Sequence, residues 1–273
     1  MYKDYTSIKH KTKLNYWQFW GIISKKFWIY MLELLLLGLF VGLLSGFFGI
    51  GGGTILIPLL LMLGFETKAA IGISVVQMVF SSIYGSYLNN KKGTLYVKMV
   101  SIIGAGGFVG ALLSGYIAAM LSDRALEILF FAFALFALMR MFFKTHEDAK
   151  EKELHYSLLL LIGVILGAFS MTIGVGGSIL LVPILVGFLH VPLKKALSAG
   201  LFFVVFSSVS GLISHTLEGH IDYASGVVIG LASLVGVYVG IHLKDKVSHA
   251  TQKRLLVIFY LFVVLYLAKR IFF

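Results

Sequence analysis

Long apolar stretches alternate with short charged ones along the chain, and this pattern predicts an all-α polytopic membrane protein. Eight segments are free or nearly free of charge, at approximately 34–65, 69–90, 99–122, 125–143, 156–193, 196–217, 223–243 and 255–273. A helix of about 20 residues crosses the ~30 Å hydrocarbon core of a bilayer. The second, third, sixth and seventh segments therefore fit single helices. The fourth and eighth fit spans whose ends hold the long basic side chains of Arg140, Lys269 and Arg270.

The first and fifth segments are too long for one span, and each contains a glycine-rich run. Residues 42–58 read G-L-L-S-G-F-F-G-I-G-G-G-T-I-L-I-P, and residues 167–183 read G-A-F-S-M-T-I-G-V-G-G-S-I-L-L-V-P. Each glycine inside a helix costs about 1 kcal/mol relative to alanine. We expect both segments to be discontinuous helices or re-entrant hairpins, broken near the bilayer interior.

The two glycine runs lie 125 residues apart, as in Gly42 and Gly167, and an offset of 125–126 persists over about 80 further residues. This spacing predicts two homologous repeats of about four spans each, in which the first span is the broken one. The expected organisation is a basic, aromatic N-terminal segment (1–30), repeat 1 (31–143), a charged linker (144–155) and repeat 2 (156–273).

Composition agrees with a lipid environment and narrows the class of function. Hydrophobic residues make up 59% of the chain, charged residues 13%, and the mean hydropathy is +0.96. The net charge of +11 comes from loops and tails, which favours contact with anionic lipids near the N-terminus over nucleic-acid binding. The absence of cysteine excludes disulfides and thiolate metal sites. We expect no cofactor, no metal site and no cleaved signal peptide.

The direction in which the chain is inserted depends on how the broken segments are counted. If each counts as one crossing and the N-terminus is cytoplasmic, 15 Lys and Arg residues lie inside and 8 outside. If both halves of each broken segment cross, the repeats are inverted and the numbers become 10 inside and 13 outside. The positive-inside rule favours eight spans in a cell membrane with a cytoplasmic N-terminus, whereas alternating access is well served by inverted repeats. The oligomeric state is left open.

Broken helices in an apolar setting indicate a binding site, because irregular backbone at membrane depth is tolerated where it lines a cavity or is buried in protein. We expect helices to restart at Thr54 and Ser178, which are good N-cap residues; the alternative is that their hydroxyls donate to a ligand. The free N–H groups of a first helical turn bind anions, and glycines allow a ligand to reach them. The alternative is that the glycines only allow close helix packing.

The expected site has no catalytic residue and combines both breaks with polar residues of neighbouring spans. Ser45 and Ser170 either offer hydroxyls to the ligand or bond their own helix, and Gln77 is either a ligand donor or a link between helices. We expect Arg124 to pair with Glu127, and His215 to be interfacial or a proton carrier. The candidate substrate-binding residues are Ser45, Gly49, Gly51, Gly52, Gly53, Thr54, Gln77, Ser81, Ser82, Ser170, Gly174, Gly176, Gly177, Ser178, Ser207 and Ser208.

The paired glycine motif and the K-K-A-L-S-A-G run at 194–200 resemble the TauE/SafE family of sulfite and organosulfonate exporters, also called the toluene-sulfonate-uptake permease group. The resemblance covers roughly residues 30–273 and implies transport of small sulfur-containing anions such as sulfite, sulfonates or sulfoacetate. Copy two departs from copy one at Met171 and Ser178, where copy one has Gly46 and Gly53, so we expect copy two to set selectivity.

Export is favoured over import, because an interior-negative membrane potential drives anions outward and no carboxylate lies mid-span. An intramembrane enzyme is the alternative from another class, and a non-transporting scaffold is a third. The chain has neither the H-E-x-x-H nor the G-x-S-G signature of such enzymes.

Overall fold

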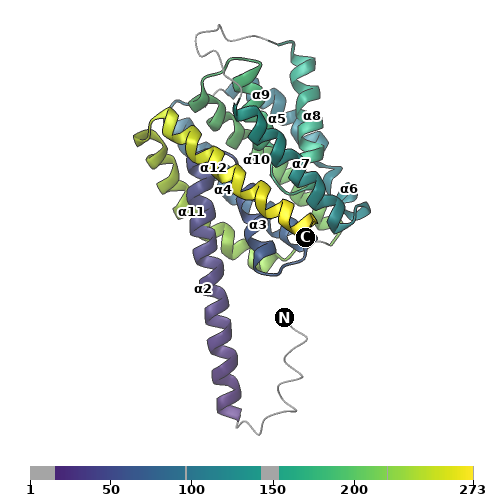
Figure 1. Cartoon of the computed structure of the whole chain (residues 1–273), viewed down its shortest axis with the longest axis vertical. Helices are drawn as coiled ribbons and strands as arrows, with labels where there is room; N and C mark the ends of the chain where they lie inside the picture. Colours follow the sequence, from purple (N-terminus) through teal and green to yellow (C-terminus); the bar gives the residue numbers. More distant parts are fainter. Residues whose placement is uncertain (1–15, 96, 143–153, 220, 273) are drawn as a thin grey trace.

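The computed structural model describes residues 16–95, 97–142, 154–219 and 221–272. The regular structure of this part of the chain is entirely α-helical, and it contains no strand (Figure 1). Its helices are α2 (Tyr16–Phe48), α3 (Gly53–Met62), α4 (Thr67–Lys91), α5 (Val97–Ala111), α6 (Ser114–Met120), α7 (Asp123–Phe142), α8 (Tyr156–Thr172), α9 (Ser178–Gly187), α10 (Leu193–Leu217), α11 (Tyr223–Lys246) and α12 (His249–Phe272).

Six stretches of helix are long and apolar enough to cross a membrane: Phe27–Phe48, Thr67–Lys91, Val97–Met120, Leu193–Leu217, Tyr223–Lys246 and Ala250–Phe272. The shorter apolar helices are α3, α8 and α9. The surface carries many large apolar side chains, such as Leu36, Leu161 and Ile258. These side chains suit a lipid environment, so the chain folds as a multi-pass membrane protein.

Two pairs of helices are held together by glycine-lined contacts. Along α2, a Cβ atom on Gly38, Gly42 or Gly46 would lie 2.5 Å or less from the carbonyl oxygen of Ile229, Ser233 or Val237 of α11. From one contact to the next the residue numbers rise along both helices, so α2 and α11 run in the same direction. In the same way, Gly106 and Gly110 of α5 face Leu160 and Val164 of α8, and these two helices also run in one direction. Small residues let the backbones approach this closely.

The long helices α4 and α10 occupy the centre and run in opposite directions. The α4 residues Val76 and Phe80 meet Gly226 and Gly230, so α4 is parallel to α11. The hydroxyls of Ser210 and Ser214 donate to the carbonyls of Phe108 and Leu112, so α10 is parallel to α5. Between α4 and α10, the contact of Gly85 with Leu201 and the hydrogen bond of Thr94 with Ser198 give an antiparallel register. Helices α2, α4 and α11 thus oppose α5, α8 and α10.

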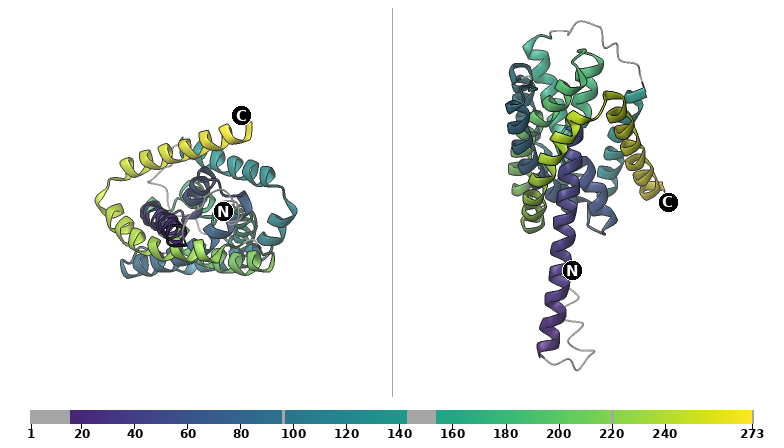
Figure 2. Two further views of the ribbon diagram at one scale, coloured as in Figure 1. Left: turned by 90° about the horizontal axis from the view of Figure 1, so that it is seen from below. Right: turned by 90° about the vertical axis from the view of Figure 1, so that its left-hand side faces the viewer.

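Helices α7 and α12 pack together along one flank of the bundle (Figure 2). Their N-termini are capped alike, because Ser122 accepts from the backbone N–H of Ala125 and Ser248 accepts from that of Thr251. Near the opposite end of α12, the guanidinium of Arg270 pairs with Glu127 at 2.9 Å.

The structure corrects one expectation of local structure and leaves two segments outside its scope. The third apolar segment does fit one span, Val97–Met120, with a short turn at 112–113 between α5 and α6. Glu127 does not pair with Arg124; it pairs with Arg270 and accepts a hydrogen bond of 2.7 Å from Thr67. The Arg124 guanidinium instead donates to the carbonyl of Ile271. Residues 1–15 of the basic N-terminal segment and 143–153 of the linker lie outside the described residues, whereas residues 16–30 belong to α2.

Candidate functional site

Each glycine run forms a short non-helical break between two helices. The chain leaves α2 at Phe48 and enters α3 at Gly53, and it leaves α8 at Thr172 and enters α9 at Ser178. Gly49 and Gly51 have φ of 64° and 69°, and the matching Gly174 and Gly176 have φ of 67° and 81°. Residues with a Cβ atom rarely adopt these angles, so both turns depend on glycine.

The helices after the breaks begin without a side-chain cap. Gly52 and Gly177 are the N-cap residues, and neither helix has a side-chain cap hydrogen bond. The expectation that Thr54 and Ser178 act as caps is therefore wrong, because both residues already lie in the first helical turn. The first N–H groups of such a turn have no acceptor within the helix and carry the positive end of its dipole.

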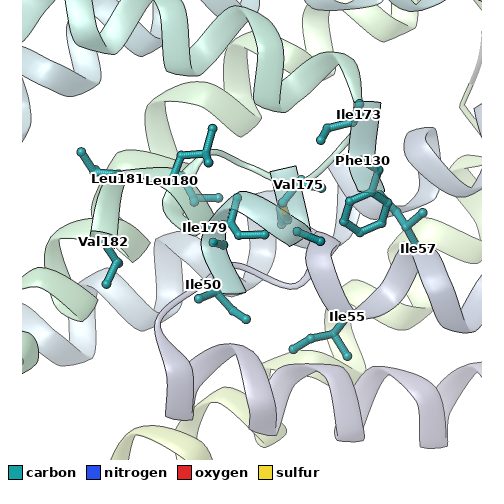
Figure 3. Close-up of a cluster of buried hydrophobic side chains, with 14 of the residues drawn as sticks. Ile50, Ile55, Ile57, Phe130, Ile173, Val175, Ile179, Leu180, Leu181 and Val182 are labelled. Atoms are coloured by element: carbon teal, nitrogen blue, oxygen red, sulfur yellow. The ribbon is translucent and has the colours of Figure 1, made fainter. Parts of the chain in front are cut away.

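The two breaks touch each other in the middle of the bundle. A Cβ atom on Gly53 would lie only 1.9 Å from the carbonyl oxygen of Gly174. Gly51 and Gly176, one from each break, both lie against Met78 of α4 and Val204 of α10. Buried apolar residues of the two breaks and of the helices after them belong to one core cluster, which includes Ile50, Val175 and Ile179 (Figure 3).

Two serines hold the carbonyl groups of the second break. The Ser74 hydroxyl donates to the carbonyl of Gly174 at 2.9 Å, and the Ser207 hydroxyl donates to that of Gly176 at 3.0 Å. Ser207 was among the expected site residues, whereas Ser74 was not. The sequence feature that could have identified Ser74 is its position one helical turn before Gln77 on α4.

Several buried polar atoms at the breaks have no hydrogen-bond partner. They are the hydroxyls of Ser45, Thr54, Ser82 and Ser178, and both ends of the Gln77 amide. Each of these side chains is 0% exposed. An unsatisfied buried polar group costs about 1–3 kcal/mol. The group at Gln77 is closest to the first break, since a Cβ atom on Gly52 would lie 1.7 Å from its Oε1.

Other expected site residues are satisfied within their own helices. Ser170 donates to the carbonyl of Leu166, one turn earlier in its own helix. The Ser81 and Ser208 hydroxyls donate to the carbonyls of Met78 and Val205 at 3.4 and 3.5 Å. His215 is fully buried, and its Nε2 lies 3.1 Å from the carbonyl oxygen of Met171.

The structure is that of a closed site. All the candidate residues at the breaks and on α4 and α10 are buried. Phe203, at the α10 position matching Gln77 of α4, lies against Gly177, where a Cβ atom would be 2.4 Å from its ring. Among the described residues, no group of three His, Asp or Glu side chains suits a metal ion. Polar side chains and the N-termini of two short helices thus lie among buried residues at the point where the breaks touch.

Comparisons with known proteins identify the family. The family model described as "Sulfite exporter TauE/SafE" matches residues 34–267. The probable membrane transporter protein YdhB of Bacillus subtilis is 28% identical over 73% of this chain and 84% of its own length. A probable membrane transporter protein of Methanocaldococcus jannaschii is 29% identical over 79% of this chain and 86% of its own. No solved structure gives a significant match. The chain therefore belongs to the sulfite exporter TauE/SafE family of membrane transporters.

Proposed function

We propose that the protein carries small anions, and that it binds them between the two glycine breaks. The observation that carries this proposal is the set of unpaired, buried polar atoms on Thr54 and Ser178, in the first turns of α3 and α9, on Gln77, and on Ser45 of α2 and Ser82 of α4. Hydroxyl and amide hydrogens, together with free backbone N–H groups, are the donors that an oxyanion needs. A bound anion accepts from the hydroxyls and from the Gln77 Nε2, which otherwise have no partner.

We further propose that residues 31–143 and 156–273 are inverted repeats in which each broken segment turns back at its glycine break, so that α2 and α4 run in one direction and α8 and α10 in the other. Support comes from the helix directions, because α2 and α8 match in sequence but oppose each other, as do α4 and α10. The contacts also match, with α2 on α11 of the other half and α8 on α5. Inverted repeats around a central site provide two equivalent routes to it, one from each side.

The substrate we propose is a sulfur oxyanion of the sulfite, sulfonate or sulfoacetate type, and the direction is export. The printed description of the family supports the chemical class. Direction follows from charge: moving one charge across the membrane is worth about 2.3 kcal/mol per 100 mV, and an interior-negative potential drives anions outward. Glu127, the buried carboxylate among the described residues, is engaged by Arg270 and Thr67 and is not placed to carry a coupling proton.

The test is flux of labelled sulfite and a small sulfonate in proteoliposomes. We expect Gly52→Val and Gly177→Val to abolish flux while the protein still inserts, because each side chain would enter the space beside Gln77 or Phe203. Gly93→Val is the matched control for Gly177→Val, since both glycines have a positive φ but a Cβ atom at Gly93 has nothing within 4 Å. Normal flux in both break variants would refute the proposal.

The direction is tested in the same vesicles. Efflux should continue when Na⁺ is replaced or the pH gradient is collapsed, because the membrane potential alone supplies the driving force. Efflux that stops under either condition would show a coupling ion and would overturn the uncoupled export.

A further inference from the structure

Lys244, near the C-terminal end of α11, is an unusual buried cation. Its side chain is 2% exposed, and its ammonium donates to the amide oxygen of Asn89 at 3.3 Å. The neighbouring carboxylate, Asp245, is taken by Lys92 at 2.6 Å. An ammonium group has three donors and is costly to bury without a negative partner. Lys244 therefore has unused capacity for an anion.

A line of buried polar residues connects Lys244 to the glycine breaks. Ser82, Ser86 and Asn89 recur about one turn apart on α4 and share a face of that helix. Ser82 and Ser86 are buried at 0% and 5% exposure, and the hydroxyls of both have no partner. Asn89, the last of the three, holds Lys244.

Ser45 lies at the same level of the bundle as these serines. Its neighbour Gly46 touches Val237 of α11, and Gly85, between Ser82 and Ser86, touches the same valine. Lys244 follows Val237 by two helical turns, or about 10 Å. Unpaired hydroxyls thus extend from the first break toward the end of the bundle at which α4 and α11 terminate.

The other half of the molecule lacks this line. With the offset of 125–126, the counterparts of Ser45 and Ser82 are Ser170 and Ser208, whose hydroxyls donate to carbonyls of their own helices. The counterparts of Ser86 and Lys244 are Leu212 and Ala118. Only one end of the bundle combines a buried cation with unpaired hydroxyls among the described residues.

We propose that Lys244 binds the substrate anion at the mouth of an access path that leads past Ser86, Ser82 and Ser45 to the glycine breaks. This inference rests on the proposed anion transport. It adds an anion-binding residue, an access path to the breaks and the end of the bundle at which that path begins. In this path the ammonium attracts the anion and the serine hydroxyls replace its water in turn.

The sequence contains no cysteine, so single cysteines can report on the path without background. Ser86→Cys is introduced into the full chain in sealed vesicles. It is treated from each side with a sulfonate-bearing methanethiosulfonate, which is anionic, and with its trimethylammonium analogue, which is cationic. We expect labelling from one side only, with a preference for the anionic reagent. Leu212→Cys, at the position that matches Ser86 in the other half, is the control and should not be labelled from that side.

Lys244→Met in the Ser86→Cys background should lower the ratio of anionic to cationic labelling rates about tenfold, the low end of electrostatic focusing in a charged cleft. Lys246→Met is the matched control, because Lys246 is exposed on the same helix and should leave the ratio unchanged. Lys244→Arg should keep the preference. If Lys244 only supports the ends of α4 and α11, the ratio will be the same in Lys244→Met, and the inference fails.

Two results separate this inference from the proposed function. Wild-type flux with an unchanged labelling ratio in Lys244→Met would overturn the role of Lys244 and leave anion transport intact. No flux of any tested anion in the wild type would overturn the proposed function, whatever the ratio. If Lys244→Met does not fold, labelling of Ser86→Cys alone decides: absence of labelling from both sides overturns the path.

Discussion

The first and second glycine breaks occupy matching positions but have different surroundings. At the first, Gly52 has an ordinary helical φ of −73° and faces the flexible amide of Gln77. At the second, Gly177 has a φ of +84° and faces the ring of Phe203. The first break therefore has a polar side chain beside its N-cap glycine, whereas the second has an aromatic ring there and one further left-handed glycine.

The serines that precede the breaks show the same difference. Ser45 has no partner for its hydroxyl, whereas Ser170 bonds the carbonyl of Leu166. Selectivity was expected to reside in the second copy, because Ser178 stands there in place of Gly53. That stays a prediction, but the unpaired atoms of Ser45, Thr54 and Gln77 lie on the side of the first copy. The following substitutions test whether the anion is bound mainly at the first break or at the second.

The largest effect is expected for Gly53→Ala. Its Cβ atom would lie 1.9 Å from the carbonyl oxygen of Gly174, and backbone cannot move aside as cheaply as a side chain. We expect loss of flux and destabilisation by about 2–4 kcal/mol, as for other severe packing defects. Thermal unfolding and proteoliposome flux are the measurements. Ser178→Ala, at the matching first position of α9, is the control and should stay close to wild-type stability. Equal losses of stability in both variants would contradict the proposed difference between the breaks.

Gln77→Leu should separate stability from function. The amide has no partner at either end, so an apolar side chain of similar size removes an unsatisfied group and should stabilise the protein by about 1 kcal/mol. At the same time the KM for the transported anion should rise about tenfold, because a ligand donor is lost.

Gln252→Leu is the control for this change. Its amide nitrogen donates to the carbonyl of Phe47 at 2.9 Å, so its removal should lower the melting temperature and leave the KM unchanged. A destabilised Gln77→Leu with unaltered KM would mean that Gln77 only links helices.

The smallest effect is expected for the paired serines. Ser45→Ala should raise the KM about threefold to fivefold, which corresponds to one modest hydrogen bond to the anion. Ser170→Ala should leave the KM unchanged, because its hydroxyl is already bonded within α8. Initial rates over a range of anion concentrations measure both. The reverse order would place the ligand at the second break and would support selectivity there.

The sequence alone predicted the membrane class and the helical fold, because apolar length and charge placement report directly on burial in lipid. It also indicated where the broken segments lie, since several glycines close together make a helix costly to continue between Phe48 and Gly53. It could not decide the direction of the halves. Counting charges favoured eight spans, whereas the register of α2 on α11 and of α8 on α5 supports inverted halves.

Side-chain partners were the least predictable part. Helical spacing suggested that Arg124 would bind Glu127, but Glu127 pairs with Arg270, 143 residues away. Lys244 looked like an ordinary lysine near the end of a span, and only its burial and its bond to Asn89 distinguish it. Contacts between distant helices decide such pairings, and one sequence does not contain them.

The central claim is that an oxyanion binds between the two breaks, and binding to the purified protein tests it most directly. A ligand at a hundred times its Kd stabilises a protein by about 2.7 kcal/mol. We predict that sulfite or a small sulfonate raises the unfolding temperature of the wild type, that chloride at equal ionic strength does not, and that Gln77→Leu combined with Thr54→Val loses most of the effect. An anion-dependent shift of the same size in the double variant would contradict the account.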